Sequence, residues 1–194
     1  LGIKLEVFMK IAIYGGSFNP PHIAHAWVVS WLLWTKKVDQ VWLIPVYHHA
    51  FEGKQDKKLV PFEERLHWCE IFAAQISPDI LVSAIEKDLP TPSYTIDTLE
   101  ELSKRYPEHQ FQLCIGSDII PQLPKWKDWN KIKKVFTPII VGRGGYGDGE
   151  EDISFPKISS TTIRRSLGEG EIPIQFLLSS VAAAIEKDNP FILS

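Results

Sequence analysis

A short motif in the first quarter of the sequence holds residues suited to binding phosphate. The motif, GGSFNPPHIAH, follows an apolar run and leads into a helix-like segment. Glycines at a strand end let backbone N–H groups approach an anion, and a helix behind them favours negative charge, so Gly15, Gly16 and Ser17 are candidate phosphate contacts. His22 and His25 share one face of the first helical turn, where two imidazoles can stabilise charge that builds up during group transfer. A tight turn with two surface histidines is the alternative, which the combination of glycines and paired histidines disfavours.

A second motif, ISSTTIR, could bind another part of the same anion. Ser160 and Thr161 belong to a run of hydroxyl side chains that suits a helix start, and Arg164 follows within one turn. A hydroxyl-rich helix N-terminus with an arginine is a candidate anion site. An ordinary capped helix with a surface arginine would explain this motif better if it stood alone. Its occurrence together with the first motif favours two phosphate contacts in one site.

The segment IGSDIIPQLPKW could contribute contacts to a nucleotide. Gly116 follows an apolar run, at the kind of strand end where open α/β sheets bind ligands. Asp118 could accept hydrogen bonds from ribose hydroxyls, and Trp126 could stack on a flat cationic ring. A half-buried core position is the alternative for Trp126, and Trp129 competes for the same role.

These residues need a scaffold that gathers distant segments at one edge. Continuous apolar runs predict buried parallel strands at residues 10–14, 40–45, 80–85, 110–115 and 137–141. Helix-like segments alternate with them at residues 21–37, 61–75, 95–106, 128–135, 160–167 and 174–187. The alternation predicts an α/β domain with right-handed crossovers over residues 9–194, preceded by an extension at residues 1–8. Polar loops are predicted at residues 50–59 and 142–152.

Composition argues against several classes of partner. The net charge of −3 provides no global basic field for nucleic acid or a membrane surface, and the longest apolar run, residues 26–34, is too short to span a bilayer. We find no secretory signal. Cys69 and Cys114 suit buried free thiols of a cytoplasmic protein better than a zinc site or a disulfide framework. The sequence leaves open whether the protein forms a homo-oligomer.

The first motif resembles the HxGH signature of the nucleotidyltransferase α/β-phosphodiesterase superfamily. More closely, it resembles bacterial nicotinate-nucleotide adenylyltransferases, whose ISSTxIR, SYTIDTL and IGxDxLxxLxxW segments are similar to ISSTTIR, PSYTIDTLEEL and IGSDIIPQLPKW here. The resemblance covers residues 10–181 and implies a Rossmann-like three-layer α/β/α nucleotidyltransferase domain. The implied reaction joins nicotinate mononucleotide to ATP, with Mg²⁺, in NAD biosynthesis, and releases pyrophosphate.

The resemblance also implies a role for each matched residue. His22 and His25 would be the catalytic pair. The residues implied to bind ATP are Gly15, Gly16, Ser17, His22, His25, Gly116, Asp118, Ser160, Thr161 and Arg164. The residues implied to bind the mononucleotide are Thr95, Trp126, Arg143 and Tyr47. A loop arginine in solvent is the alternative for Arg143, and no set of protein ligands for a metal is predicted, because the adjacent His48 and His49 point apart.

Two departures from the family pattern leave alternatives open. Ala24 stands where the HxGH signature has glycine. The loop after the second predicted strand reads IPVYHHAFEGKQ, so that Tyr47, His48, His49 and Phe51 replace a Pro-Pro-His segment beside the mononucleotide. The acceptor could therefore be nicotinamide mononucleotide or phosphopantetheine, and a catalytically weak nucleotide-sensing module is the alternative from another class.

Overall fold

The computed structural model describes residues 8–48, 59–144 and 153–192. Within these residues, six parallel strands form a sheet in the order β3-β2-β1-β4-β5-β6. The strands are β1 (Lys10–Gly16), β2 (Gln40–Pro45), β3 (Ile80–Val82), β4 (Gln110–Gly116), β5 (Ile139–Arg143) and β6 (Ser154–Phe155). The predicted parallel sheet is confirmed, and β6 is an added edge strand that the sequence pattern did not reveal.

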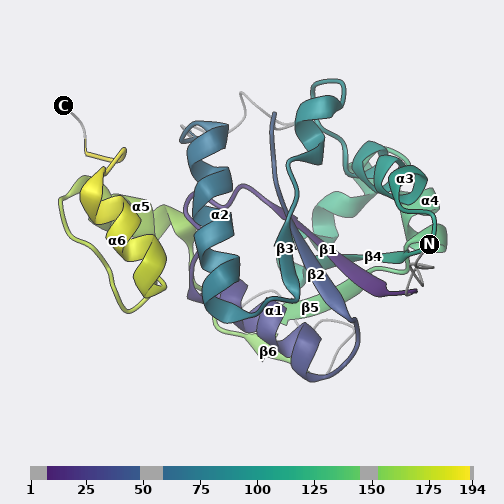
Figure 1. Ribbon diagram of the computed structural model, residues 1–194, viewed down its shortest axis with the longest axis horizontal. Coiled ribbons are helices and arrows are strands. Elements are labelled where there is room, and N and C mark those ends of the chain that lie inside the picture. The colour runs from purple at the N-terminus through teal and green to yellow at the C-terminus, as the bar shows by residue number, and fades with distance from the viewer. Residues whose placement is uncertain (1–7, 49–58, 145–152, 193–194) are drawn as a thin grey trace, which may run out of the picture.

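Helices cover both faces of this sheet, so the predicted three-layer α/β/α arrangement is confirmed (Figure 1). The α-helices are α1 (Ile23–Trp34), α2 (Phe62–Ile76), α3 (Thr95–Arg105), α4 (Trp129–Val135), α5 (Ser160–Gly168) and α6 (Ser179–Lys187). Two 3₁₀ segments, η1 (Ile85–Asp88) and η2 (Ser117–Lys125), join them. Helices α3 and α4 cover one face, α1 and α2 cover the other, and α6 packs against α2 at one end of the molecule.

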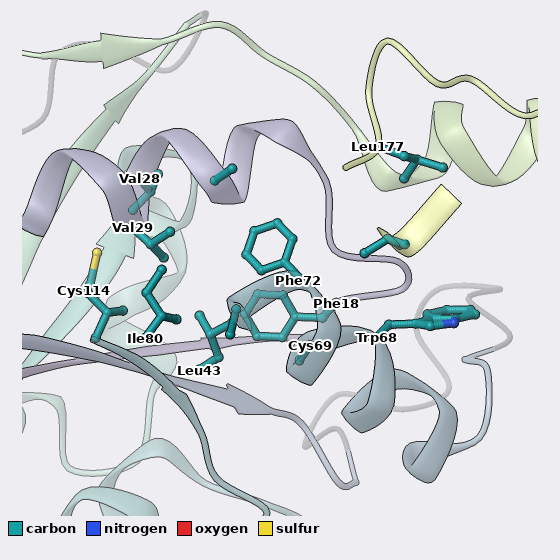
Figure 2. Packing of buried hydrophobic residues seen from close by; sticks show 14 of the residues in the cluster. Phe18, Val28, Val29, Leu43, Trp68, Cys69, Phe72, Ile80, Cys114 and Leu177 are labelled. Carbon is teal, nitrogen blue, oxygen red and sulfur yellow. The ribbon is translucent and has the colours of Figure 1, made fainter. Parts of the chain in front are cut away.

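The central strand β1 shows why both faces are apolar. Ile11 and Ile13 point to the face under α3 and α4, whereas Ala12 between them points to the face under α1 and α2. All three are buried, as a central strand of a parallel sheet requires. Figure 2 shows the second face, where Val29 of α1 and Phe72 of α2 approach the sheet.

Several predicted boundaries are wrong for local reasons. Strand β3 ends at Val82, and the residues predicted to continue it turn into η1. Helix α6 begins at Ser179 rather than at residue 174; the preceding segment turns, and the carbonyl of Phe176 accepts a hydrogen bond from the N–H of Ile23 at 2.9 Å. Strand β5 runs on to Arg143, so the predicted loop at residues 142–152 begins later, and residues 145–152 lie outside the described residues.

Among the described residues, no helix has both the length and the apolar character needed to cross a bilayer.

Candidate active site

A cavity of about 760 Å³ lies where β1, β4 and β5 end and where α1, α3 and α5 begin. Ligands of open parallel sheets bind at this edge. All but one of the residues predicted to bind substrate line the cavity: Gly15, Gly16, Ser17, His22, His25, Thr95, Gly116, Asp118, Trp126, Arg143, Ser160, Thr161 and Arg164. Ala24, the departure from the HxGH signature, also lines it. The fold thus brings together residues from both ends of the sequence.

The turn between β1 and α1 orients the two histidines. Phe18 has a positive φ of 43°, an uncommon conformation for a bulky residue, and its buried ring lies 5.0 Å from the ring of His25. His22 is the N-cap residue of α1, and its backbone N–H donates a hydrogen bond to Nδ1 of His25 at 3.0 Å. Because Nδ1 of His25 accepts this bond, the proton of the neutral ring lies on Nε2. His25 is therefore fixed as an Nε2–H donor.

His22 lies beside His25 at the start of α1. The two ring centroids are 3.9 Å apart, and the His22 side chain is 2% exposed. The His22 side chain faces the backbone N–H of His25 in the capping box at the start of α1, and its buried Nδ1 atom makes no hydrogen bond of normal geometry among the described residues. Because His22 also lines the cavity, its ring can contact a ligand there.

Burial keeps both imidazoles neutral. Desolvation, with a smaller contribution from the Arg143 guanidinium, lowers the pKa of His22 from 6.5 to about 3. Desolvation, followed by the charges of His22 and Arg143, holds the pKa of His25 well below its ordinary value. An anionic ligand would oppose the effect of burial on both rings, because a nearby negative charge favours the imidazolium form.

Helix α5 brings the second motif to the first. Its N-cap residue is Ser159, whose Oγ accepts a hydrogen bond from the N–H of Thr161 at 3.2 Å. One terminal nitrogen of Arg164 donates to the carbonyl of Asn19 at 3.0 Å, and the other donates to Oγ1 of Thr161 at 3.1 Å. Arg165, the next residue, is exposed and does not line the cavity. Arg164 therefore joins the two phosphate motifs, which lie 145 residues apart at this contact.

A half-buried network lines the cavity at the ends of β4 and β5. Arg143 donates from Nη1 to Oδ2 of Asp118 at 2.6 Å and from Nη2 to the carbonyl of Ile158 at 2.7 Å. The other carboxylate oxygen of Asp118 lies over Gly116, where a Cβ atom would collide with it. Glycine at this position lets Asp118 fold back toward Arg143. Arg143 is thus not a solvent-exposed loop residue.

The residues predicted to bind the mononucleotide differ in their placement. Thr95 is the first residue of α3, and Trp126 directly follows η2, and both line the cavity. Trp129, the competing tryptophan, packs edge-on against Trp126 and is not among the lining residues. Tyr47 does not line the cavity either: its ring packs edge-on against Phe62, with the centroids 5.1 Å apart. Its N–H donates to Glu86.

Two buried charged residues of the site were not predicted. Arg65 is 1% exposed and Glu86 is 8% exposed, and Glu86 lines the cavity. A sequence signal existed for Arg65, because it follows Phe62 by three residues and precedes Trp68 by three, on the apolar face of a helix. No comparable periodicity marks Glu86, which lies in a short 3₁₀ segment.

The described part of the chain offers no metal cage of its own. Within it, no three histidine, cysteine, aspartate or glutamate side chains lie close enough together to hold a metal ion. His49, Phe51 and Lys54, which belong to the unusual loop, lie outside the described residues.

Because His22 and His25 are neutral in the folded protein, we predict that the free energy of unfolding falls in mild acid. Unfolded histidine takes up a proton near pH 6.5, whereas folded His22 does so only near pH 3, so between these values the unfolded state binds more protons. The free energy of unfolding should therefore fall with decreasing pH by about 1.4 kcal/mol per pH unit for each such histidine. The full contribution is present above pH 6.5. Urea unfolding at several pH values between neutrality and mild acid measures the slope.

A His22→Asn variant is the control for this slope, because asparagine does not titrate. The variant should lose about half of the pH dependence that the two histidines produce. Equal slopes in variant and wild type would mean that His22 is not neutral in the folded protein.

Comparison with known proteins assigns the chain to a family. Residues 13–166 match the cytidylyltransferase-like family. The chain is 40% identical over 165 residues to a probable nicotinate-nucleotide adenylyltransferase of Anaeromyxobacter sp. (strain K), covering 84% of this chain and 86% of that protein. It is 32% identical over 186 residues to a probable nicotinate-nucleotide adenylyltransferase of Bacillus pumilus, covering 93% of this chain and 96% of that protein.

Solved structures share the fold. The nicotinic acid mononucleotide adenylyltransferase of Plasmodium falciparum, complexed with NaAD, superposes with a TM-score of 0.74 at 22% identity, covering 94% of this chain and 97% of that one. A putative nicotinate-nucleotide adenylyltransferase from Vibrio parahaemolyticus gives a TM-score of 0.69 at 23% identity, covering 92% of each chain. With the sequence matches, we conclude that the chain belongs to the cytidylyltransferase-like family and, within it, to the nicotinate-nucleotide adenylyltransferases.

Proposed function

We propose that the protein transfers the adenylyl group of ATP to nicotinate mononucleotide, giving deamido-NAD and pyrophosphate in NAD biosynthesis. The observation that carries this proposal is the contact between the two phosphate motifs, in which Arg164 donates to the carbonyl of Asn19 at 3.0 Å. Through it, a glycine-rich strand end, two helix N-termini and two histidines surround one cavity, as the binding of a polyphosphate requires. The relatives, which are probable nicotinate-nucleotide adenylyltransferases, support the same reaction.

The ATP would occupy the side of the cavity that the two motifs share. Its phosphates would contact backbone N–H groups of the turn after β1, the imidazoles of α1 and the start of α5. Ser160, Thr161 and Arg164 would bind the β- and γ-phosphates, and the ribose hydroxyls would reach Asp118 beside Gly116. The residues of this proposed ATP site are Gly15, Gly16, Ser17, His22, His25, Gly116, Asp118, Ser160, Thr161 and Arg164.

The reaction then needs positioning and charge stabilisation rather than a general base. The phosphate of the mononucleotide is already ionised at neutral pH, so it can attack the α-phosphorus of ATP directly while pyrophosphate leaves. The Nε2–H of His25 is a fixed donor, and the ring of His22 lines the cavity beside it. Negative charge on the phosphates favours protonation of these rings, which would strengthen their hydrogen bonds as charge develops.

We infer that Mg²⁺ would enter this site bound to the phosphates of ATP rather than to protein ligands. The carboxylates that line the described cavity are Asp118 and Glu86, and each already binds protein groups. Magnesium retains several waters and bridges phosphates readily, so it would neutralise phosphate charge without a protein cage.

The acceptor would occupy the side of the cavity near α3 and η2. Thr95 at the start of α3 would donate a hydrogen bond to the mononucleotide, and the face of Trp126 would stack on its cationic pyridine ring. Arg143 reaches the cavity while paired with Asp118, so it would add positive charge between the two substrates. Tyr47 could contribute only at the rim, because its ring contacts Phe62 and its N–H is occupied.

A competition between two acceptors tests the proposal. With ATP held equal, kcat/KM measured by pyrophosphate release should be higher for nicotinate mononucleotide than for nicotinamide mononucleotide. The two differ by a full charge, which lets a site discriminate between them by its hydrogen-bond donors alone.

Each other outcome points to a different function. A higher kcat/KM for nicotinamide mononucleotide would overturn the acceptor while preserving adenylyl transfer. If phosphopantetheine were the one acceptor that is turned over, the protein would be a related nucleotidyltransferase that uses this acceptor. Tight ATP binding without turnover of any acceptor would assign a sensing module.

A further inference from the structure

One peptide group beside the cavity is held from both ends by buried charged side chains. The carbonyl of Val46 accepts a hydrogen bond from Nη2 of Arg65 at 2.8 Å. The N–H of Tyr47, which belongs to the same peptide group, donates to Oε2 of Glu86 at 2.9 Å. Val46 and Glu86 line the cavity, and the N–H of Val46 donates to the carbonyl of Gly16 in the phosphate-binding turn. The orientation of this peptide plane is therefore fixed at the junction of the two proposed substrate sites.

Arg65 connects that peptide with the phosphate-binding turn. Its Nη1 atom donates to the carbonyl of Ser17 at 2.9 Å, and its Nε atom donates to the carbonyl of Val60 at 2.9 Å. One planar guanidinium thus spans the turn after β1, the end of β2 and the start of α2. The compact ammonium of lysine cannot reproduce this rigid fork of donors.

Glu86 connects the same peptide with the acceptor side. Its second oxygen, Oε1, accepts a hydrogen bond from the hydroxyl of Thr98 at 3.2 Å. Thr98 follows Thr95 by three residues on α3, so the two lie on neighbouring positions of one helix face. Burial raises the pKa of Glu86 above its ordinary value, and its bonds to Tyr47, Ser93 and Thr98 and the nearby charge of Arg65 offset this rise only in part.

We propose that Glu86 and Arg65 are positioning residues of the adenylyl transfer. Glu86 holds the acceptor side through the Tyr47 amide and Thr98, and Arg65 keeps that side at a fixed distance from the phosphate-binding turn at Ser17. Neither needs to touch the reacting atoms, because a displacement of about 1 Å between two substrates can cost about 100-fold in rate. This inference rests on the proposed function. It adds two residues that hold the acceptor side of the cavity in a fixed position relative to the phosphate-binding turn.

Variants of Glu86 separate positioning from stability. Glu86→Ala leaves the Tyr47 amide without its acceptor, so the KM for nicotinate mononucleotide should rise about tenfold, while the KM for ATP should change less than about twofold. Glu86→Gln should restore most of the affinity, because its amide oxygen can accept from Tyr47 and its NH₂ group can donate to Thr98. Ile85→Ala is the matched control: Ile85 is buried in the adjacent position but does not line the cavity. The control should lose stability without a change in either KM.

Arg65→Lys tests the link to the phosphate side. It should lower kcat about tenfold or more at saturating concentrations of both substrates, because the fork that sets their separation is lost. A folded Arg65→Lys variant with wild-type kcat would overturn the role of Arg65. If this variant does not fold, the variants of Glu86 decide the proposal.

Amide hydrogen exchange of Tyr47, followed by NMR, gives a second readout that does not depend on turnover. Exchange should be slow in the wild type and in Glu86→Gln, and faster in Glu86→Ala. An unchanged acceptor KM in Glu86→Ala, equal rises in both KM values, or unchanged exchange would overturn the inference. Absence of wild-type turnover would instead refute the proposed function, and the exchange measurement would then decide alone whether Glu86 fixes this peptide.

Discussion

Replacing His25 by alanine should lower kcat by about two to three orders of magnitude, the effect of removing a donor aimed at developing charge. The backbone N–H of His22 holds Nδ1 of His25 at 3.0 Å, so the Nε2–H of this cavity-lining ring has little freedom to reorient. Alanine removes that donor. It also removes a hydrogen bond at the start of α1, which should cost only about 1 kcal/mol of stability. Pyrophosphate release at saturating substrates measures the first effect, and urea unfolding measures the second.

A second histidine provides the control for this experiment. His67 lies on α2 with its side chain 60% exposed, and it does not line the cavity. His67→Ala should turn over like the wild type. Wild-type turnover in His25→Ala would remove His25 from the catalytic machinery, and an unfolded variant would show that its main role is structural.

Arg164→Ala should mainly weaken the binding of ATP. A charge-assisted hydrogen bond to phosphate is worth about 1.5–3 kcal/mol, so the Kd should rise roughly tenfold to 150-fold. Arg164 is held by Asn19 and Thr161, which places its guanidinium at the meeting point of the two motifs. Calorimetric titration with a non-hydrolysable ATP analogue measures this change directly.

Arg165 makes this test specific, because it has the same charge one position further along α5 and is exposed outside the cavity. Arg165→Ala should bind the analogue like the wild type. Equal losses of affinity in the two variants would attribute the effect to net charge, and equal affinity in Arg164→Ala and wild type would exclude Arg164 from the ATP site.

The parts of the site that could be predicted are those whose residues follow one another in the sequence. A strand, two glycines and a helix start follow one another in the first motif, so its local geometry depends little on the rest of the fold. The same holds for the capped start of α5. Continuous apolar runs predicted β2 at residues 40–45 without error, because a strand buried on both faces needs no alternation.

The parts that could not be predicted depend on tertiary contacts. Glu86 is buried because Tyr47, Ser93 and Thr98 meet it in space, and no spacing in the sequence links these residues. Helix α6 begins after a turn whose Phe176 carbonyl accepts from the first N–H of α1, a contact between distant segments that no local pattern reveals. Tyr47 follows β2, and its ring contacts Phe62 on α2, a packing that its position in the sequence does not reveal.

The parallel sheet also has a consequence for how the protein folds. In the centre of the sheet, Ile11 pairs with Gln40 on one side, and Lys10 pairs with Gln110 on the other. Such a topology has a high contact order, because strands that pair are separated by long segments of chain. Bringing these segments together costs conformational entropy before β1 gains both neighbours, so we expect slow folding. During translation, β1 can pair with β4 only after β4 has left the ribosome. The carbonyl of Asn19 can accept its hydrogen bond from Arg164 only later, because Arg164 follows β4 in the sequence. A nascent chain can therefore form the contact between its two motifs only after all six described strands have been translated.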